Sequence, residues 1–362
     1  MPRSKKDVVN RRNFLKTAAA GGIATLAAST GALAASAPQA TPPAPAKLPA
    51  MPKETDPAGD VHVLTVDRSG SDFMVDVIKA LGFEYVASNP GSSFRALQES
   101  LINYGGNKAP EFLTCCHEES SVGIAHGYAN VEGKPMLVLA HSTVGLQHAS
   151  MGIYNAWAGR APVYVMLGNT LDETMRRPGV EWYHSAVDAA AMVRDFTKWD
   201  DTPISLPHFA ESAVRGYKIA MTLPREPVVL VIDSDLQEKE VDKGAVLRIP
   251  RLTLDTHPQG DSGAVNEAAR LLIAAENPVV IAGRVARTPE GMQRLIAFAE
   301  ALQAPVIDQG DNLPSRHPLN QIGGNAALLG NADVVLTLEV ENPWGLLHGY
   351  RDQQERSYRS NT

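Results

Sequence analysis

Cysteine is almost absent from this sequence. The 362 residues include only two, Cys115 and Cys116, which are adjacent. Neighbouring residues of a strand point to opposite faces of a sheet, so a disulfide between them would require a distorted backbone. Two thiols also provide too few ligands for a structural zinc site. The sequence therefore excludes a disulfide-stapled domain, and we expect both cysteines to be small packing residues rather than redox or metal centres.

Aromatic residues and basic charge are also scarce over most of the chain. Aromatics make up 6% of the sequence, against 44% hydrophobic residues overall. This composition suits close packing of helices on a sheet, and the length allows two medium-sized domains with cores. The formal net charge is −7, and without the first 34 residues the remaining 27 basic and 39 acidic residues would give −12. Such a charge gives no support for a nucleic acid or an anionic membrane as partner.

The N-terminal residues contain the three parts of an export signal. Arg11 and Arg12 are followed by a weakly apolar run at residues 17–29 and by Ala-Leu-Ala at residues 32–34. A basic start, a short apolar region and such a cleavage site are typical of a signal peptide, and the paired arginines resemble a twin-arginine signal. We predict a twin-arginine signal peptide over residues 1–34 and export to the periplasm; a basic disordered tail is the alternative. The run is too short and too weakly hydrophobic for a stable membrane span.

After a Pro/Ala-rich linker at residues 35–60, the sequence alternates between helical patterns and short apolar runs. These runs are rich in Val and Leu and occupy residues 83–87, 112–116, 136–140, 163–167 and 228–232. Apolar runs without alternation are typical of strands buried on both faces, and helices between them imply right-handed crossovers. Asp72 is a candidate cap for the first helix. We expect an α/β fold with a doubly wound parallel sheet over residues 61–235.

A linker at residues 236–262 and a second, incomplete Rossmann-like α/β domain at residues 263–362 are expected to follow. Strand-like runs occur at residues 279–282, 306–308 and 334–338, and a polar tail begins at residue 351. A parallel sheet of about three strands is small for a stable layer. The sequence therefore indicates either a truncated domain or strands supplied from elsewhere, and truncation is the interpretation that we favour.

Three turns carry most of the candidate chemistry. They are Asn-Pro-Gly-Ser at residues 89–92, His117-Glu118 and His141-Ser142-Thr143. Each stands where a predicted strand is followed by a predicted helix. The carboxyl ends of parallel strands meet at one edge of the sheet, which is where open α/β sheets bind ligands. A carboxylate and histidines gathered there indicate a catalytic half-site.

Glu118 begins a predicted helix nine residues before Gly127. A carboxylate at this position can simply offset the helix dipole, and Glu119 could do the same. However, a strand, His-Glu and a helix continuing into Gly-Tyr-Ala resemble the pyrimidine-binding domain of thiamine diphosphate enzymes. The resemblance implies that Glu118 hydrogen-bonds the aminopyrimidine ring of the cofactor and starts the deprotonation of its thiazolium carbon, which then attacks a 2-oxo acid.

The turns on either side resemble the benzoylformate decarboxylase branch of this family. That resemblance implies that Ser92 contacts the substrate carboxylate and that His141 acts in proton transfer. It further implies that Gly91, Thr143 and Gly145 lie against the cofactor. The alternatives are a helix N-cap for Ser92 and a hydrogen-bonded loop histidine for His141. His117 and His126 are interpreted as structural.

The sequence after residue 304 resembles the family's central domain, on Pro-Val-Ile at 305–307, Ser-Arg-His-Pro-Leu-Asn at 315–320 and Ala-Asp-Val-Val-Leu at 332–336. Other parts resemble the acetolactate synthase-like branch, whose central domain often holds FAD, so FAD is left open as a second cofactor. His348 lies near the place of another active-site histidine of the decarboxylase branch, but its spacing does not fit.

The family binds the cofactor's diphosphate and Mg²⁺ through a third domain, marked by Gly-Asp-Gly and a later Asn-Asn pair. The sequence contains no such pair of motifs, so the oxygen ligands that Mg²⁺ needs are missing from it. The resemblance therefore implies either a homo-oligomer of a longer chain or a partner chain with that domain.

The resulting prediction is a thiamine diphosphate-dependent 2-oxo-acid decarboxylase or carboligase. Two alternatives stay open: a catalytically silent fragment that keeps the fold and its dimerisation surface, and an unrelated nucleotide-binding module.

Overall fold

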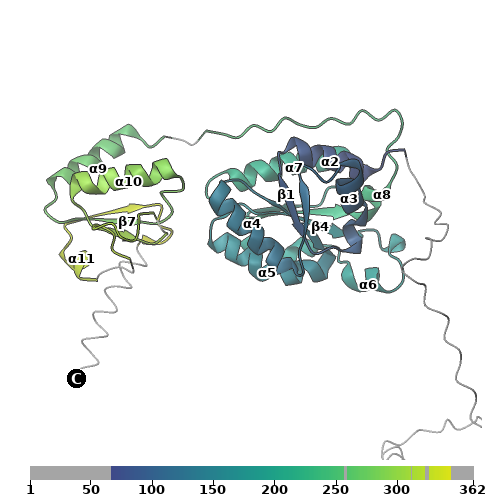
Figure 1. Cartoon of the computed structure of the whole chain (residues 1–362), viewed down its shortest axis with the longest axis horizontal. Coiled ribbons are helices and arrows are strands. Elements are labelled where there is room, and N and C mark those ends of the chain that lie inside the picture. Colours follow the sequence, from purple (N-terminus) through teal and green to yellow (C-terminus); the bar gives the residue numbers. More distant parts are fainter. Residues whose placement is uncertain (1–66, 257–258, 311, 323–325, 344–362) are drawn as a thin grey trace, which may run out of the picture. The chain divides into compact units, whose positions relative to one another are not determined.

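The computed structural model describes residues 67–256, 259–310, 312–322 and 326–343. The predicted signal peptide, the linker at residues 35–60 and His348 lie outside these residues. The described residues form two parallel sheets with their helices (Figure 1). Among the described helices, none combines the length and the apolar character needed to cross a bilayer.

The first sheet has six strands, all parallel, in the order β2-β1-β3-β4-β6-β5. The strands are β1 (Tyr85–Ser88), β2 (Glu111–Thr114), β3 (Leu137–His141), β4 (Tyr164–Asn169), β5 (Trp199–Asp201) and β6 (Val228–Asp233). Their order steps outward in both directions from the centre, as in a doubly wound sheet. The predicted fold class is therefore confirmed. The central strands β3, β4 and β6 are buried almost throughout, as their continuous Val and Leu runs indicated.

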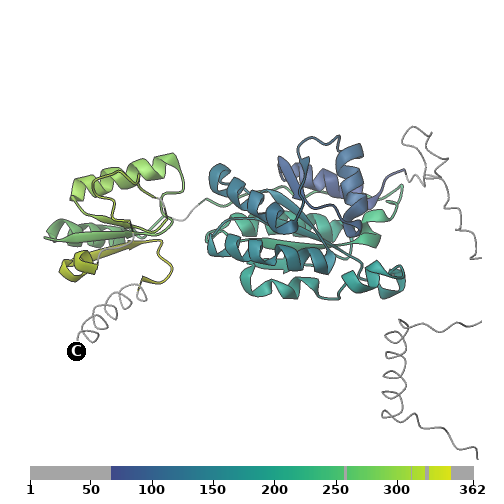
Figure 2. The same cartoon turned by 60° about the horizontal axis from the view of Figure 1, so that its bottom comes forward.

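Helices cover both faces of this sheet (Figure 2). One face carries α2 (Gly70–Ala80), α3 (Arg95–Glu99) and α7 (Leu206–Met221), and the other carries α4 (Glu118–Glu132) and α5 (Ser142–Ala158). Shorter segments are a 3₁₀ turn (Ser92–Phe94), a π-helical turn (Ser100–Tyr104), α6 (Val180–His184), α8 (Ser234–Glu238) and 3₁₀ turns at Glu173–Met175, Ala189–Met192 and Arg194–Phe196. Small residues let α4 and α5 approach closely: a Cβ on Gly152 would lie 3.0 Å from that of Val122. Cys115 packs in this second core, as predicted, whereas Cys116 is exposed.

The ends of two helices differ from the prediction. Ser69, not Asp72, is the N-cap of α2; its side chain accepts from the Asp72 amide, while the Asp72 carboxylate accepts from the Ser69 amide. This reciprocal pair is a capping box. The sequence pattern predicts the next helix from Gly145, but α5 begins at Ser142, directly after the last residue of β3. The turn after β3 is thus tighter than the sequence pattern indicated.

The second sheet has three parallel strands in the order β8-β7-β9. These are β7 (Pro278–Ala282), β8 (Val306–Asp308) and β9 (Val334–Leu338); the helices are α9 (Ser262–Ala274), α10 (Pro289–Leu302) and α11 (Ala326–Asn331). Helices α9 and α10 pack on one face and α11 on the other. Before α9, Leu247, Ile249 and Leu252 pack against the first domain, so this part of the predicted linker is attached to that domain.

Candidate active site

The carboxyl ends of three neighbouring strands bring the candidate turns together. In the register of the sheet, Ser88 at the end of β1 pairs with Thr114 at the end of β2 and with Leu139 in β3. The segments that follow these strands contain Ser92, Glu118 and Ser142. The predicted meeting of the three turns at one edge of the sheet is therefore present.

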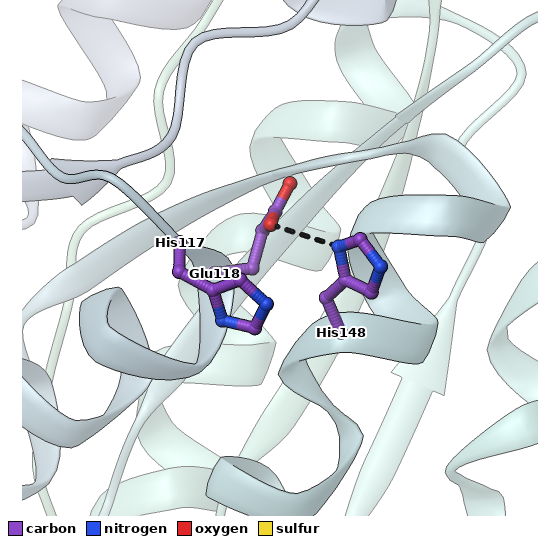
Figure 3. A group of neighbouring side chains, drawn as sticks. All are labelled: His117, Glu118 and His148. Atoms are coloured by element: carbon purple, nitrogen blue, oxygen red, sulfur yellow. Dashed lines mark ion pairs between the residues drawn. The ribbon is translucent and has the colours of Figure 1, made fainter.

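Glu118 is the first residue of α4 and is only 3% exposed. Its Oε2 is buried and has no hydrogen-bond partner in the described residues. His148 of α5 approaches this oxygen, with its Nδ1 3.4 Å from Oε2 (Figure 3). That distance is long for a charge-assisted hydrogen bond. A buried carboxylate oxygen without a donor is costly, so this oxygen is suited to receive a hydrogen bond from a ligand.

His117 precedes Glu118 and caps α4. Its Nδ1 accepts from the Glu119 amide at 3.2 Å, which supports the predicted structural role. Its ring stacks on that of His148, with centroids 4.9 Å apart and an interplanar angle of 21°. These rings and the Glu118 carboxylate offer three ligand atoms within 4.8 Å of one another. The contact that these side chains make in the structure is a ring stack of His117 on His148 beside the Glu118 carboxylate.

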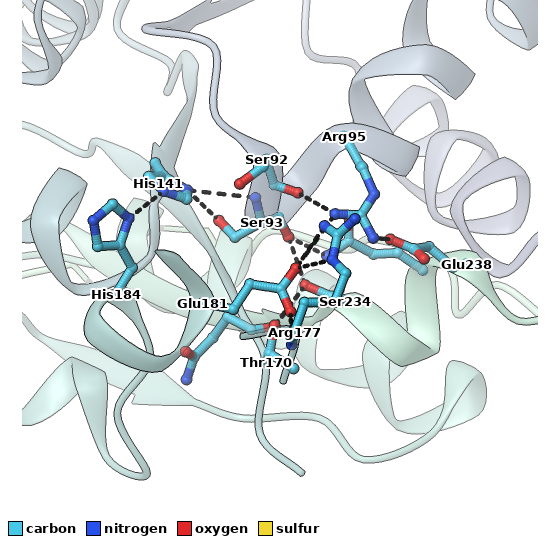
Figure 4. A network of polar contacts seen from close by, with 12 residues as sticks. Ser92, Ser93, Arg95, His141, Thr170, Arg177, Glu181, His184, Ser234 and Glu238 are labelled. Atoms are coloured by element: carbon cyan, nitrogen blue, oxygen red, sulfur yellow. Dashed lines mark hydrogen bonds and ion pairs between the residues drawn. The ribbon is translucent and has the colours of Figure 1, made fainter. Parts of the chain in front are cut away.

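His141 ends β3 and is held through both ring nitrogens. Its Nδ1 lies 2.9 Å from Ser93 Oγ and 3.4 Å from the Ser93 amide nitrogen, and its Nε2 lies 2.9 Å from Nδ1 of His184 (Figure 4). The pKa of His141 is lowered, first by burial and then by His184, while Glu118 acts in the opposite direction. The imidazole therefore favours its neutral form.

The two serines of the first turn differ in burial. Ser92 is exposed and begins the 3₁₀ turn, whereas Ser93 is 8% exposed and is the one that contacts His141. Gly168 makes room for it, because a Cβ at that position would lie 2.5 Å from Ser93 Oγ. The substrate contact assigned to Ser92 stays a prediction.

The three residues predicted to lie against the cofactor all line this edge. A Cβ on Gly91 would lie 2.4 Å from Cβ of His141, and one on Gly145 would lie 3.1 Å from Glu118 Oε1. Thr143 Oγ1 donates to the carbonyl of His184 at 2.6 Å. The two glycines thus keep space beside the proposed catalytic side chains, and Thr143 holds a neighbouring segment in place.

Three residues of the site, His148, His184 and Ser93, were not predicted as site residues from the sequence. His148 is two turns into α5, beyond any motif, and its approach to Glu118 depends on how α4 and α5 pack. His184 is 43 residues from His141 in a segment without apolar periodicity. For Ser93 alone the sequence contained an indication, because it stands beside Ser92 and before a predicted helix.

Two family descriptions match the chain. "Thiamine pyrophosphate enzyme, N-terminal TPP binding domain" covers residues 68–192, and "Thiamine pyrophosphate enzyme, central domain" covers residues 265–344. Together they include both sheets described above, apart from β5 and β6.

Individual relatives point the same way. A sulfoacetaldehyde acetyltransferase of Rhodobacter capsulatus is 26% identical over 76% of this chain and 46% of its own length. The acetolactate synthase large subunit of Haemophilus influenzae is 26% identical over 66% of this chain and 41% of its own. The crystal structure of benzoylformate decarboxylase from Polynucleobacter necessarius has a TM-score of 0.62 and 26% identity, over 75% of this chain and 51% of that one. The chain thus spans about half the length of the curated relatives it matches.

Proposed function

The chain belongs to the thiamine pyrophosphate enzyme family, with that family's N-terminal and central domains, and we propose that it takes part in the decarboxylation or carboligation of a small 2-oxo acid. Relatives named for acyl transfer, acetolactate synthesis and benzoylformate decarboxylation support this range of reactions. The competing proposal is a catalytically silent chain that keeps the fold and its pairing surface.

The observation that carries the proposal is the buried, unpartnered Oε2 of Glu118. An aminopyrimidine ring offers a nitrogen that can share a proton with a carboxylate, and Gly145 leaves room beside the other carboxylate oxygen. The donor set therefore fits the pyrimidine end of thiamine diphosphate. When bound, the cofactor supplies a nucleophilic thiazolium carbon for attack on the carbonyl of a 2-oxo acid.

The roles of the protein side chains follow from their surroundings. Glu118 would hold a proton at the pyrimidine nitrogen, and its burial strengthens that interaction because water does not compete for it. The lowered pKa of His141 favours the neutral ring, so it would exchange a proton with the substrate rather than form an ion pair. Ser92, exposed at the neighbouring turn, would receive the substrate carboxylate.

The diphosphate end of the cofactor needs residues that this sequence does not contain, since Gly-Asp-Gly with a downstream Asn-Asn is absent from the 362 residues. We propose that a further domain supplies these groups and the oxygen ligands for Mg²⁺, either in a longer form of the chain within a homo-oligomer or in a partner chain. FAD binding by the second domain stays an open part of the proposal.

Periplasmic export is also proposed, and replacing Arg11 and Arg12 together by lysine should retain the protein in the cytoplasm.

The test is exchange of the cofactor's C2 proton, measured by NMR after quenching, in the enzyme assembled with a diphosphate-binding domain. We expect Glu118→Gln to slow this exchange by ~10²–10⁴-fold, the range of a lost general acid–base group. Glu119→Gln is the matched control, because Glu119 is the exposed neighbour, and it should leave exchange unchanged. Equal rates for both variants would sink the role given to Glu118, and exchange no faster than in free solution would favour the silent chain.

Calorimetry on this chain alone tests the missing-domain part separately. We expect no Mg²⁺-dependent binding of thiamine diphosphate at micromolar concentration. Tight, Mg²⁺-dependent binding would contradict the need for another domain.

A further inference from the structure

His184 contacts the proposed catalytic histidine without belonging to any of the three motif turns. It ends the short helix α6 and reaches His141 from a segment 43 residues away, with the two rings edge to face at 5.1 Å. We propose that His184 is a positioning residue that fixes the proton of His141 on Nε2. The catalytic role of His141 rests on the proposed function, whereas the contact between His141 and His184 is independent of it.

The partners of His141 assign its tautomer. An amide N–H can only donate, and that of Ser93 points at Nδ1 of His141. Nδ1 therefore accepts, and the proton of the neutral ring is on Nε2. That proton faces Nδ1 of His184 at 2.9 Å, so His184 must accept there and carry its own proton on Nε2. The Ser93 amide at Nδ1 and the His184 acceptor at Nε2 thus favour the same tautomer of His141 from the two ends of the ring.

The backbone of His184 is held in place by hydroxyl groups from the start of α5. Ser142 Oγ and Thr143 Oγ1 both donate to the His184 carbonyl. Two residues further, the Asn169 side chain donates to the Ala186 carbonyl at 2.7 Å. Ser142 has φ +45°, in the left-handed region, which disfavours a non-glycine residue by ~1 kcal/mol or more. In this conformation the Ser142 hydroxyl reaches the carbonyl of His184.

Ion pairs connect α6 to the residue that follows the 3₁₀ turn Ser92–Phe94 (Figure 4). Glu181 pairs with Arg177 at 2.6 Å and with Arg95 at 3.6 Å, and Arg95 pairs in turn with Glu238 at 2.5 Å. Such partly exposed pairs contribute only ~0–1 kcal/mol each. They orient α6 relative to Ser93, while the buried hydroxyl contacts hold the backbone of His184.

The electrostatic surroundings of His141 agree with this role. Burial and His184 lower its pKa, and Glu118 of α4 is the charged group that opposes them; Ser93 on the remaining side is uncharged. Loss of the His184 ring would remove the acceptor for the Nε2 proton and, whenever that ring is itself protonated, a repulsive neighbour as well. The tautomer and the titration of His141 should therefore both respond to His184.

The experiment is ¹⁵N NMR of histidine-labelled chain over a pH titration, with the His141 signals identified by their loss in His141→Gln. In the wild type we expect the Nε2–H tautomer. His184→Leu should shift His141 toward a mixture of tautomers and move its pKa up toward the ordinary value of ~6.5. His184→Gln keeps an acceptor that cannot take up a proton, so it should preserve the tautomer while the pKa of His141 still rises. His208→Gln, in α7, is the control and should change neither.

Unchanged tautomer and titration of His141 in folded His184→Leu would overturn the proposal. If His184→Leu does not fold, His184→Gln decides through the pKa of His141: a rise supports the contact, and no change overturns it. The readout needs no cofactor. A His184-dependent tautomer in a protein that never binds thiamine diphosphate would refute the proposed function and leave this inference standing.

Discussion

Gly145 of α5 faces the buried carboxylate of Glu118 so closely that a Cβ placed on it would lie 3.1 Å from Oε1. The same Cβ would lie 3.2 Å from the carbonyl carbon of Ala140, which is backbone and cannot swing away. This glycine is therefore needed for space rather than for its backbone freedom. The buried carboxylate, at the start of α4, thus lies against α5, and its Oε2 has no hydrogen-bond partner among the described residues.

Gly145→Ala should displace the Glu118 carboxylate. We expect a loss of ~1–3 kcal/mol in the free energy of unfolding, the usual cost of overpacking, measured by urea denaturation. The control is Gly123→Ala in α4, where an added Cβ meets nothing within 4 Å. There the better helix propensity of alanine should add ~0.5–1 kcal/mol. If both variants gained stability, the close approach at Gly145 would be contradicted.

Gly91→Ala should crowd His141, as Gly145→Ala should crowd Glu118. The added Cβ would lie 2.4 Å from Cβ of His141, whose ring is held by Ser93 and His184 and has little freedom to move. Since φ at Gly91 is −149°, alanine meets no backbone strain there. We expect a loss of ~1–3 kcal/mol in unfolding free energy from crowding alone.

The control for Gly91 is Gly244→Ala, at a position with open space around the missing Cβ. Its unfolding free energy should change by less than ~1 kcal/mol. A Gly91→Ala protein as stable as the wild type, with His141 unchanged in its NMR titration, would show that the turn has room.

Acid should destabilise the first domain through its half-buried histidines. Burial lowers the pKa of His126 below its usual range, so between that value and ~6.5 the unfolded chain binds a proton that the native state does not. Stability is then full above pH ~6.5 and falls as the pH decreases toward the folded pKa. His141 contributes with the same sign. Urea midpoints between pH 5 and 7 should show this decline, and His126→Gln should make it shallower; an identical slope in that variant would refute the assignment.

Asp308 should be a stability determinant of the second domain. Its carboxylate accepts from the amides of Gly310, Asn312 and Leu313 and from the Asn312 side chain, at 2.8–3.1 Å. Burial acts to raise its pKa, but these donors prevail and the pKa is lowered. The contribution is present above ~3.9 and is lost as the pH falls through the lowered folded pKa.

Asp308→Asn should cost ~1–3 kcal/mol of unfolding free energy, because an amide NH₂ would replace an acceptor facing several donors. The matched control is Asp261→Asn at the N-cap of α9, where Asp261 accepts from the Ala264 amide at 2.8 Å. Asparagine caps a helix about as well as aspartate, so this variant should be neutral. Hydrogen exchange of the amides in β7 and β8 measures the loss of stability in each variant. An equal loss in Asp308→Asn and Asp261→Asn would argue against the network at Asp308.

Strands with strong local patterns were predictable, and strands defined by their neighbours were not. β4 and β6 are apolar runs buried on both faces, so their sequences alone indicate them. β5 is Trp-Asp-Asp, half-buried, and among the described strands it lies at the end of the sheet, paired with β6. Its strand conformation comes from that pairing and from no pattern of its own.

The sequence alone places Glu118 between a strand and a helix and a histidine at the end of a second strand, because these positions follow from apolar runs along one stretch of chain. Which serine meets His141, and that His184 completes the pair, came only from the three-dimensional structure. A hydrogen bond depends on the placement of two groups to within a few tenths of an ångström. For His141 and His184, 43 residues apart, that placement is set by how α6 is anchored over the sheet edge, which no local pattern encodes.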